Sequence, residues 1–128
     1  MTVVTAQNIF RAGAALAATG ISFGAFGAHA LRSRFDLPES SHQSWMTGSN
    51  YLIYNGLALL ALSAHPSVAL GLKRYKTAAG LIVGGVLVFS GSIFGLVLAR
   101  DKVGKVLGPI TPMGGFAMIA GYIALALP

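Results

Sequence analysis

The feature that most constrains this fold is a series of long apolar runs separated by short basic segments. Charged residues make up only 9% of the 128 residues, whereas hydrophobic residues make up 55%. A soluble domain of this size carries about 25% charged residues. Apolar runs of about 20 residues are long enough to cross the hydrocarbon core of a bilayer as helices. The sequence therefore predicts an all-α integral membrane protein.

Four membrane spans are expected, because the apolar residues fall into four groups. The first and third groups, 12–31 and 77–99, are long enough to span alone, and the first exceeds the core of a signal peptide. The second and fourth are apolar only over 51–64 and 113–127 and need the less apolar turns before them. Short connections predict antiparallel neighbours, as in an up-down four-helix transmembrane bundle with Gly/Ala-rich helix seams. The expected spans are about 8–31, 44–65, 76–99 and 107–127, within one domain covering 1–128.

The basic residues lie at the ends of these spans. Nine Lys and Arg against three acids give a net charge of +6. At span ends, such side chains reach lipid headgroups, so membrane lipids are expected partners. They are not gathered on one face as a nucleic-acid surface requires, so no nucleic acid is expected. The up-down order divides them four against five between the two sides, which leaves the orientation open.

Glycine is frequent, with 17 residues, and recurs at spacings of three and four within the spans. Faces of this kind let helix backbones approach closely, which is how helices associate in lipid. We expect most of them to pack helices within the chain; the alternative is a groove for a lipid tail or another subunit's helix. The residues assigned to helix packing are Gly20, Gly24, Gly80, Gly84, Gly91, Gly95, Gly114 and Gly121.

Polar residues gather where an up-down bundle brings its first and third loops to one membrane surface. Polar side chains at membrane depth face the protein interior and form hydrogen bonds. Two interpretations stay open: a hydrogen-bonded cluster that fixes helix register, and a small recess that binds a ligand or headgroup. The expected members are His29, Asn50, Tyr51, Tyr54, Asn55, Ser90, Ser92 and Thr111.

Catalytic chemistry is not indicated. The acids Asp36, Glu39 and Asp101 all lie in expected loops, so no carboxylate pair is placed for acid–base catalysis. The histidines are divided between the two membrane surfaces, and the chain has no cysteine. We therefore expect no catalytic residue, no metal site and no cofactor.

Three short motifs resemble the signatures of one family of small membrane proteins. They are Gly24–Leu31 (GAFGAHAL), Phe89–Ser92 (FSGS) and Ile110–Gly115 (ITPMGG). The family contains bacterial YgdD-like and eukaryotic transmembrane-protein-256-like proteins, and the resemblance covers nearly the whole chain. It implies a four-helix membrane fold and no known reaction. Where this chain has Asn55, the family usually has a histidine, which implies a hydrogen-bonding role here rather than a protonation role.

The resemblance also bears on location and function. The motif preceded by Leu107-Gly108-Pro109 is more similar to fungal mitochondrial members, which implies the mitochondrial inner membrane; the alternative is a bacterial inner membrane. The expected function is a non-catalytic accessory subunit beside other membrane-protein subunits, in a respiratory-chain complex, with complex I foremost. A small lipid-handling or solute-transport protein that uses the polar recess is the alternative. A membrane enzyme is disfavoured, because catalytic residues are missing.

Overall fold

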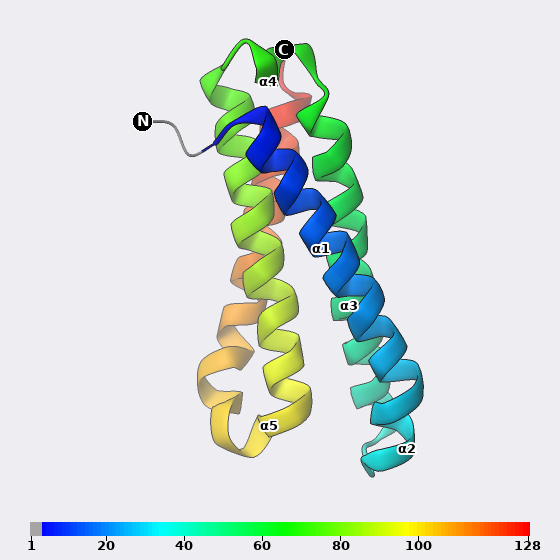
Figure 1. Ribbon diagram of the computed structural model, residues 1–128. Coiled ribbons are helices and arrows are strands. Elements are labelled where there is room, and N and C mark those ends of the chain that lie inside the picture. Colours follow the sequence, from blue (N-terminus) through cyan, green and yellow to red (C-terminus); the bar gives the residue numbers. More distant parts are fainter. Residues whose placement is uncertain (1–3) are drawn as a thin grey trace.

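All regular structure in the computed structural model, which describes residues 4–128, is helical (Figure 1). The all-α prediction is confirmed. The elements are α1 (Ala6–Phe26), the π-helical segment η1 (Gly27–Leu31), α2 (Arg32–Arg34), α3 (Glu39–Ser63), α4 (Pro66–Ala69) and α5 (Lys73–Ala126).

The ends of α1 and α3 follow from local chemistry. The side chain of Thr5 caps α1 by accepting a hydrogen bond from the backbone N–H of Asn8 at 3.1 Å. α1 continues through η1 and α2 until the backbone becomes extended at Phe35. α3 ends at Ser63, three residues before Pro66, since the residue before a proline disfavours helical backbone.

α5 is a pair of helical arms rather than one straight rod. Its 54 residues include non-helical backbone at Ala99, with φ −148° and ψ 42°. There α5 folds back, and its arms run side by side (Figure 1). Arg74, in the first arm, donates a hydrogen bond of 2.7 Å to the backbone oxygen of Pro128, just beyond the second. Each arm of about 26 residues is about 39 Å long, which exceeds a hydrocarbon core of about 30 Å.

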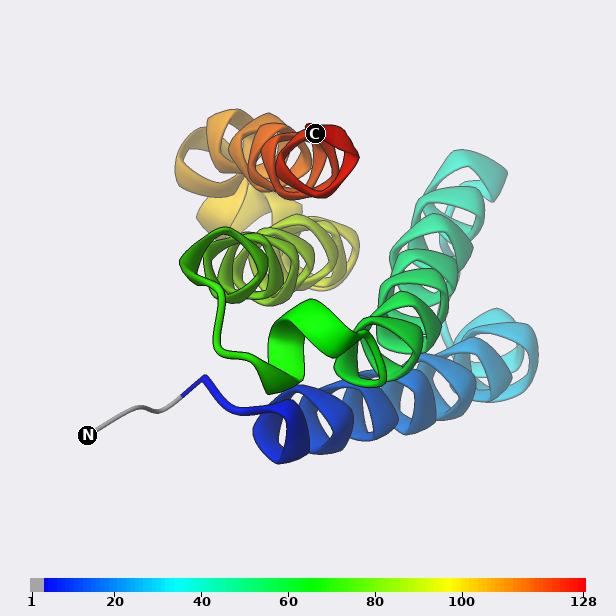
Figure 2. The ribbon, with the colours of Figure 1, turned by 90° about the horizontal axis from the view of Figure 1, so that it is seen from above.

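Four helical rods therefore run up and down: α1 with its extension, α3, and the two arms of α5. Seen from above, α3 lies between α1 and the first arm of α5, and the second arm lies on the far side of the first (Figure 2). The buried core follows this order, with side chains from each rod. It includes Leu16, Leu52, Leu59, Ile82, Val86, Ile93 and Met118.

Glycine permits the closest helix contacts. A Cβ atom added to Gly13 would lie 2.7 Å from the carbonyl oxygen of Gly56, and one added to Gly20 would lie 2.8 Å from that of Ser49. Both distances are shorter than carbon and oxygen tolerate, so α1 and α3 approach backbone to backbone. The same holds between the α5 arms at Gly114 and Gly85.

Two helical stretches are long and apolar enough to cross a membrane, judged by length and composition: Ala6–Arg34 and Lys73–Ala126. α3 is not one of them, because polar residues dilute its first half. The second arm of α5 also differs from expectation. It begins directly after Ala99 and includes Pro109 and Pro112, although Pro112 was expected in the first turn of the fourth span. The basic stretch 100–105 is thus helix rather than loop.

Candidate functional site

The first motif forms a tight joint between the end of α1 and the beginning of α3. A Cβ atom at Gly27 would collide with the indole ring of Trp45. The Trp45 Nε1–H donates a hydrogen bond of 2.8 Å to the carbonyl oxygen of Phe23, one turn before η1. Trp45 also packs on Phe94 of α5, with ring centroids 4.6 Å apart. Gly27 therefore makes room for Trp45, which links the three helices.

The second motif supplies hydroxyl contacts between helices. The hydroxyl of Ser90, fully buried in α5, donates a hydrogen bond of 2.7 Å to the carbonyl oxygen of Gly48 in α3. The hydroxyls of Ser92 and Thr111 lie 2.6 Å apart and join the two arms of α5. Such hydroxyl contacts fix register between helices in lipid.

The third motif allows the two arms of α5 to touch. A Cβ atom at Gly114 would lie 2.5 Å from the backbone nitrogen of Phe89 and 2.6 Å from the carbonyl oxygen of Gly85. Only a residue without a side chain fits there. The third motif, like the first two, therefore has a structural use.

A separate polar site lies between α3 and the second arm of α5, which we call the Asn55 recess. The Asn55 side chain is only 3% exposed, and its Nδ2 donates a hydrogen bond of 2.8 Å to the carbonyl oxygen of Tyr51. Its Oδ1 accepts a hydrogen bond from the hydroxyl of Tyr122. The recess has a volume of about 380 Å³. It is lined by Tyr51, Tyr54, Asn55, Phe89, Gly115, Met118, Ile119 and Tyr122.

The Asn55 recess lies deep along the helices. Tyr51 is the central residue of α3, and Asn55 is four residues further on, about 6 Å by helix rise. Tyr122 belongs to the last turns of α5, at the end opposite the Ala99 break. The recess is therefore not at the surface formed by the first and third connections, where the sequence placed the polar residues.

The eight residues expected to form one polar cluster are separated. Tyr51, Tyr54 and Asn55 share the recess, whereas Ser90 bonds to α3 elsewhere and Ser92 pairs with Thr111. His29 is exposed and Asn50 is half-buried outside these contacts. Tyr122 was missed, because no local sequence pattern shows that it lies opposite Asn55.

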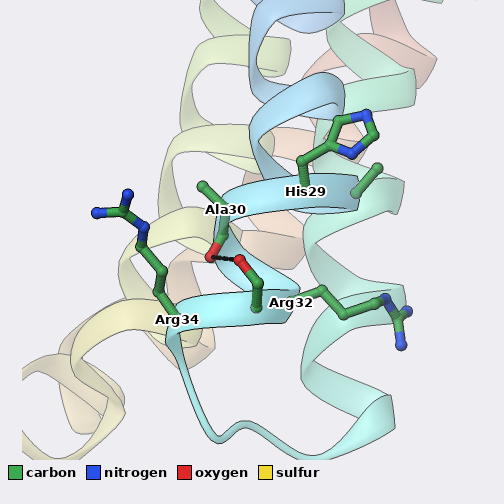
Figure 3. A pocket seen from close by; sticks show the side chains of 6 residues that line it. His29, Ala30, Arg32 and Arg34 are labelled. Atoms are coloured by element: carbon green, nitrogen blue, oxygen red, sulfur yellow. Dashed lines mark hydrogen bonds between the residues drawn. The ribbon is translucent and has the colours of Figure 1, made fainter.

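The end of α1 carries a broad open hollow of about 540 Å³, lined by Ala28, His29, Ala30, Arg32, Ser33 and Arg34. In Figure 3 the side chains of His29, Arg32 and Arg34 point in different directions and do not converge on a common point. Arg32 forms a two-pronged ion pair with Glu39, with contacts of 3.0 and 3.2 Å. These residues therefore close the connection from α1 to α3 rather than surround a ligand.

The three histidines belong to different segments of the described structure. His42 is buried at the beginning of α3, and its Nδ1 has no hydrogen-bond partner among residues 4–128. His65 caps α4 through Ser67 N–H at 3.1 Å and stacks on Tyr75, with ring centroids 4.8 Å apart. Across the described residues, no three His, Asp or Glu side chains gather in an arrangement that would hold a metal ion.

The expected packing glycines fall into two groups. Gly20, Gly114 and Gly121 meet neighbouring helices closely, Gly95 meets the Leu107 side chain of the other arm, and Gly24 lies in ordinary contact with Met46. Gly80, Gly84 and Gly91 differ from expectation. A Cβ atom at any of these three would meet nothing within 4 Å in residues 4–128. The first arm of α5 instead packs through Gly85, on the adjoining face, so three of the four glycines in the predicted seam of the third span lie on an exposed surface.

Comparison with known proteins identifies the family. Residues 23–115 match the family model described as "Protein of unknown function (DUF423)", a range that includes all three motifs. The chain belongs to this family. It is 34% identical to a UPF0382 membrane protein of Schizosaccharomyces pombe, over 93% of this chain and 98% of the relative. It is 34% identical to the UPF0382 membrane protein YwdK of Bacillus subtilis, over 90% and 89%. No solved structure matches.

The DUF423 relatives occur in bacteria as well as in a fungus. A UPF0382 membrane protein of Staphylococcus aureus is 38% identical, over 90% of this chain and 88% of the relative. These relatives are named as membrane proteins, in agreement with the two apolar helical stretches. The chain is accordingly a DUF423 membrane protein, and the resemblance inferred from the three motifs is confirmed at the family level.

Proposed function

We propose that this DUF423 protein crosses the membrane with all four helical rods and acts as a non-catalytic accessory subunit of a larger membrane complex. The observation that carries the proposal is the exposed glycine face of the first α5 arm. Gly80, Gly84 and Gly91 lie within about 40° of one another around the helix. A Cβ atom added at any of the three would meet nothing within 4 Å in the described chain.

An exposed glycine face on an apolar helix suits a second membrane helix. Helices in lipid associate by close packing of small residues, because lipid tails are as apolar as the side chains. Gly80 and Gly84 also line an apolar groove of about 370 Å³, together with Ile9 and Ala12 of α1. A transmembrane helix of another subunit would lie along this groove and the glycine face.

The use of the motif residues supports a non-catalytic role. Gly27, Ser90, Ser92, Thr111 and Gly114 all make or permit contacts between helices of this chain. Residues committed to close packing are not available to bind and transform a substrate. This use of the three motifs favours a scaffold role.

The host of the subunit stays a prediction from the sequence. A respiratory-chain complex, complex I foremost, in the mitochondrial inner membrane was inferred from the resemblance to fungal members. Relatives from Bacillus subtilis and Staphylococcus aureus match over nearly the same share of the chain as the fission-yeast relative. A host present in both bacteria and fungi fits this distribution better than a host confined to mitochondria.

Native-gel migration after extraction in mild detergent tests the accessory role. The chain should migrate with a large complex, and Gly84→Leu should release it, because the new side chain keeps the partner helix away. Gly108→Leu is the matched control, since a Cβ atom added at Gly108 would also meet nothing within 4 Å in the described chain but Gly108 lies on the other arm. Migration as a monomer or dimer before any substitution would contradict the proposal.

A small lipid-handling protein is the second candidate function, and the Asn55 recess is the observation that favours it. Because the recess lies near the middle of α3, away from the helix ends, it suits an apolar ligand better than a water-soluble solute.

A further inference from the structure

The Asn55 recess offers hydrogen-bond donors that the described chain does not use. Tyr51 and Tyr54 line the recess, and within residues 4–128 neither hydroxyl forms a hydrogen bond. The Asn55 amide has a second N–H beyond the one bound to the Tyr51 carbonyl. Polar groups at membrane depth seek partners, because lipid tails supply none. The recess thus favours a ligand with hydrogen-bond-accepting oxygens.

The walls of the recess favour a flat ring. Tyr51 packs on Phe89 with ring centroids 4.8 Å apart, and on Tyr54 with centroids 5.9 Å apart. Aromatic walls stabilise a ring by offset stacking more than they stabilise a flexible acyl chain. A volume of about 380 Å³ is also in the range of sites for small ring compounds.

The depth of the Asn55 recess in the membrane distinguishes between the molecules that could supply hydrogen-bond-accepting oxygens. The ester carbonyls of phospholipids lie near the boundary of a hydrocarbon core about 30 Å thick, about 15 Å from the bilayer centre. Asn55 lies about 6 Å along α3 from its central residue. With α3 crossing the bilayer as proposed above, a carbonyl beside Asn55 belongs to a molecule that dissolves in the hydrocarbon core.

From these observations we infer that the Asn55 recess binds a lipid-soluble ring compound bearing carbonyl oxygens, the chemistry of a prenylquinone. The ring lies against the aromatic walls, and its oxygens accept hydrogen bonds from the hydroxyls of Tyr51 and Tyr54. Its tail extends into lipid beside Ile119, which is 56% exposed. The inference rests on the membrane placement proposed above and not on the accessory role.

The test uses the purified full chain in phosphatidylcholine nanodiscs, titrated with decylubiquinone. Binding should saturate at one molecule per chain and raise the thermal unfolding midpoint. A photoreactive azidoquinone should label α3 near Tyr51 or the second α5 arm near Ile119. The double variant Tyr51→Phe/Tyr54→Phe keeps both rings and should weaken binding about fivefold for each hydrogen bond lost. Tyr75→Phe, outside the recess, is the matched control and should bind as the unmodified chain does.

Several results would overturn the inference. These are the absence of saturable binding, equal affinity in the double variant and the control, and equal displacement of the quinone by oleate or ergosterol. The single variant Tyr54→Phe serves if the double variant unfolds, because Tyr54 is 58% exposed. Gly84→Leu should leave quinone binding unchanged, so failure of the accessory role and failure of the quinone site give different results.

Discussion

At the scale of single residues, Asn55 is the polar group with the most defined role. It joins α3 to the second α5 arm by accepting from the Tyr122 hydroxyl, while its amide bonds to its own helix. Asn55→Leu removes both contacts and should lower the free energy of unfolding by about 1–2 kcal/mol, the usual scale of interhelical polar contacts in lipid. Unfolding in mixed detergent micelles measures the difference. Asn55→His should be tolerated, because an unprotonated imidazole nitrogen also accepts a hydrogen bond from a hydroxyl.

Tyr122→Phe provides the control for this prediction. If the contact is the source of the stability, Asn55→Leu should cost less in the Tyr122→Phe background than in the unmodified chain. An equal cost in both backgrounds would show that Asn55 stabilises α3 alone.

The sequence predicted that Asn55 faces the protein, because it shares a helical face with Tyr51 and Tyr54. It did not identify Tyr122, because no local pattern shows which residue of a distant helix will lie opposite. The same limit explains why the residues expected to form one polar cluster are separated in the structure. Membership in it assumed that equivalent span ends lie at equal depth, whereas α3 begins at Glu39, earlier than the expected span.

At the scale of helices, two glycine-to-alanine substitutions test the two glycine faces of α5. In Gly114→Ala the new Cβ would lie 2.6 Å from the carbonyl oxygen of Gly85, so the arms must separate. We expect a loss of about 1–3 kcal/mol, the scale of overpacking. In Gly84→Ala the new Cβ meets nothing within 4 Å in the described chain, and alanine favours helix by up to about 1 kcal/mol. Thermal unfolding followed by circular dichroism in detergent compares them.

A loss of stability in both variants would contradict the assignment of an open face to Gly84. The sequence alone did not make this distinction. Gly84 and Gly85 are adjacent, so spacings of three and four fit either of two helical faces, and only the packed partner decides between them. For Gly20 the spacing was sufficient, because no neighbouring glycine offered a second face.

The helix boundaries were likewise predicted in part: the positions of the reversals followed from the sequence, but the form of the last one did not. The expected spans predicted helices that reverse direction within 32–43, 66–75 and 100–106, and α5 breaks at Ala99. The exact form of the last reversal was not predictable. Basic residues after position 99 indicate solvent or headgroups, but an exposed helix and a loop have the same composition there. Helix also continues through Pro109 and Pro112, which local rules would place at a helix start.

At the scale of the whole molecule, the up-down order predicts which connections share a membrane surface. Figure 1 places the α1–α3 connection and the Ala99 turn at one end, and α4 at the other. The chain has no cysteine, so each introduced thiol is the only one present. In sealed vesicles, a membrane-impermeant maleimide should give Asp36→Cys and Lys102→Cys the same result, either both labelled or both protected. Ser67→Cys should give the opposite result, because it lies at the other end of the bundle. The charges do not predict which side is labelled.

Leu57→Cys completes the experiment, because Leu57 is 54% exposed on α3 yet should face lipid if α3 spans the membrane. In intact membranes it should resist the maleimide on either side, since a thiol surrounded by hydrocarbon is not ionised and the reagent does not enter. Detergent that exposes the helix to water should restore labelling. Rapid labelling of Leu57→Cys in intact membranes would mean that α3 does not span, and the short apolar length of its second half would be the reason. Protection would place α3 in the bilayer, held there by α1 and α5 despite its polar first half.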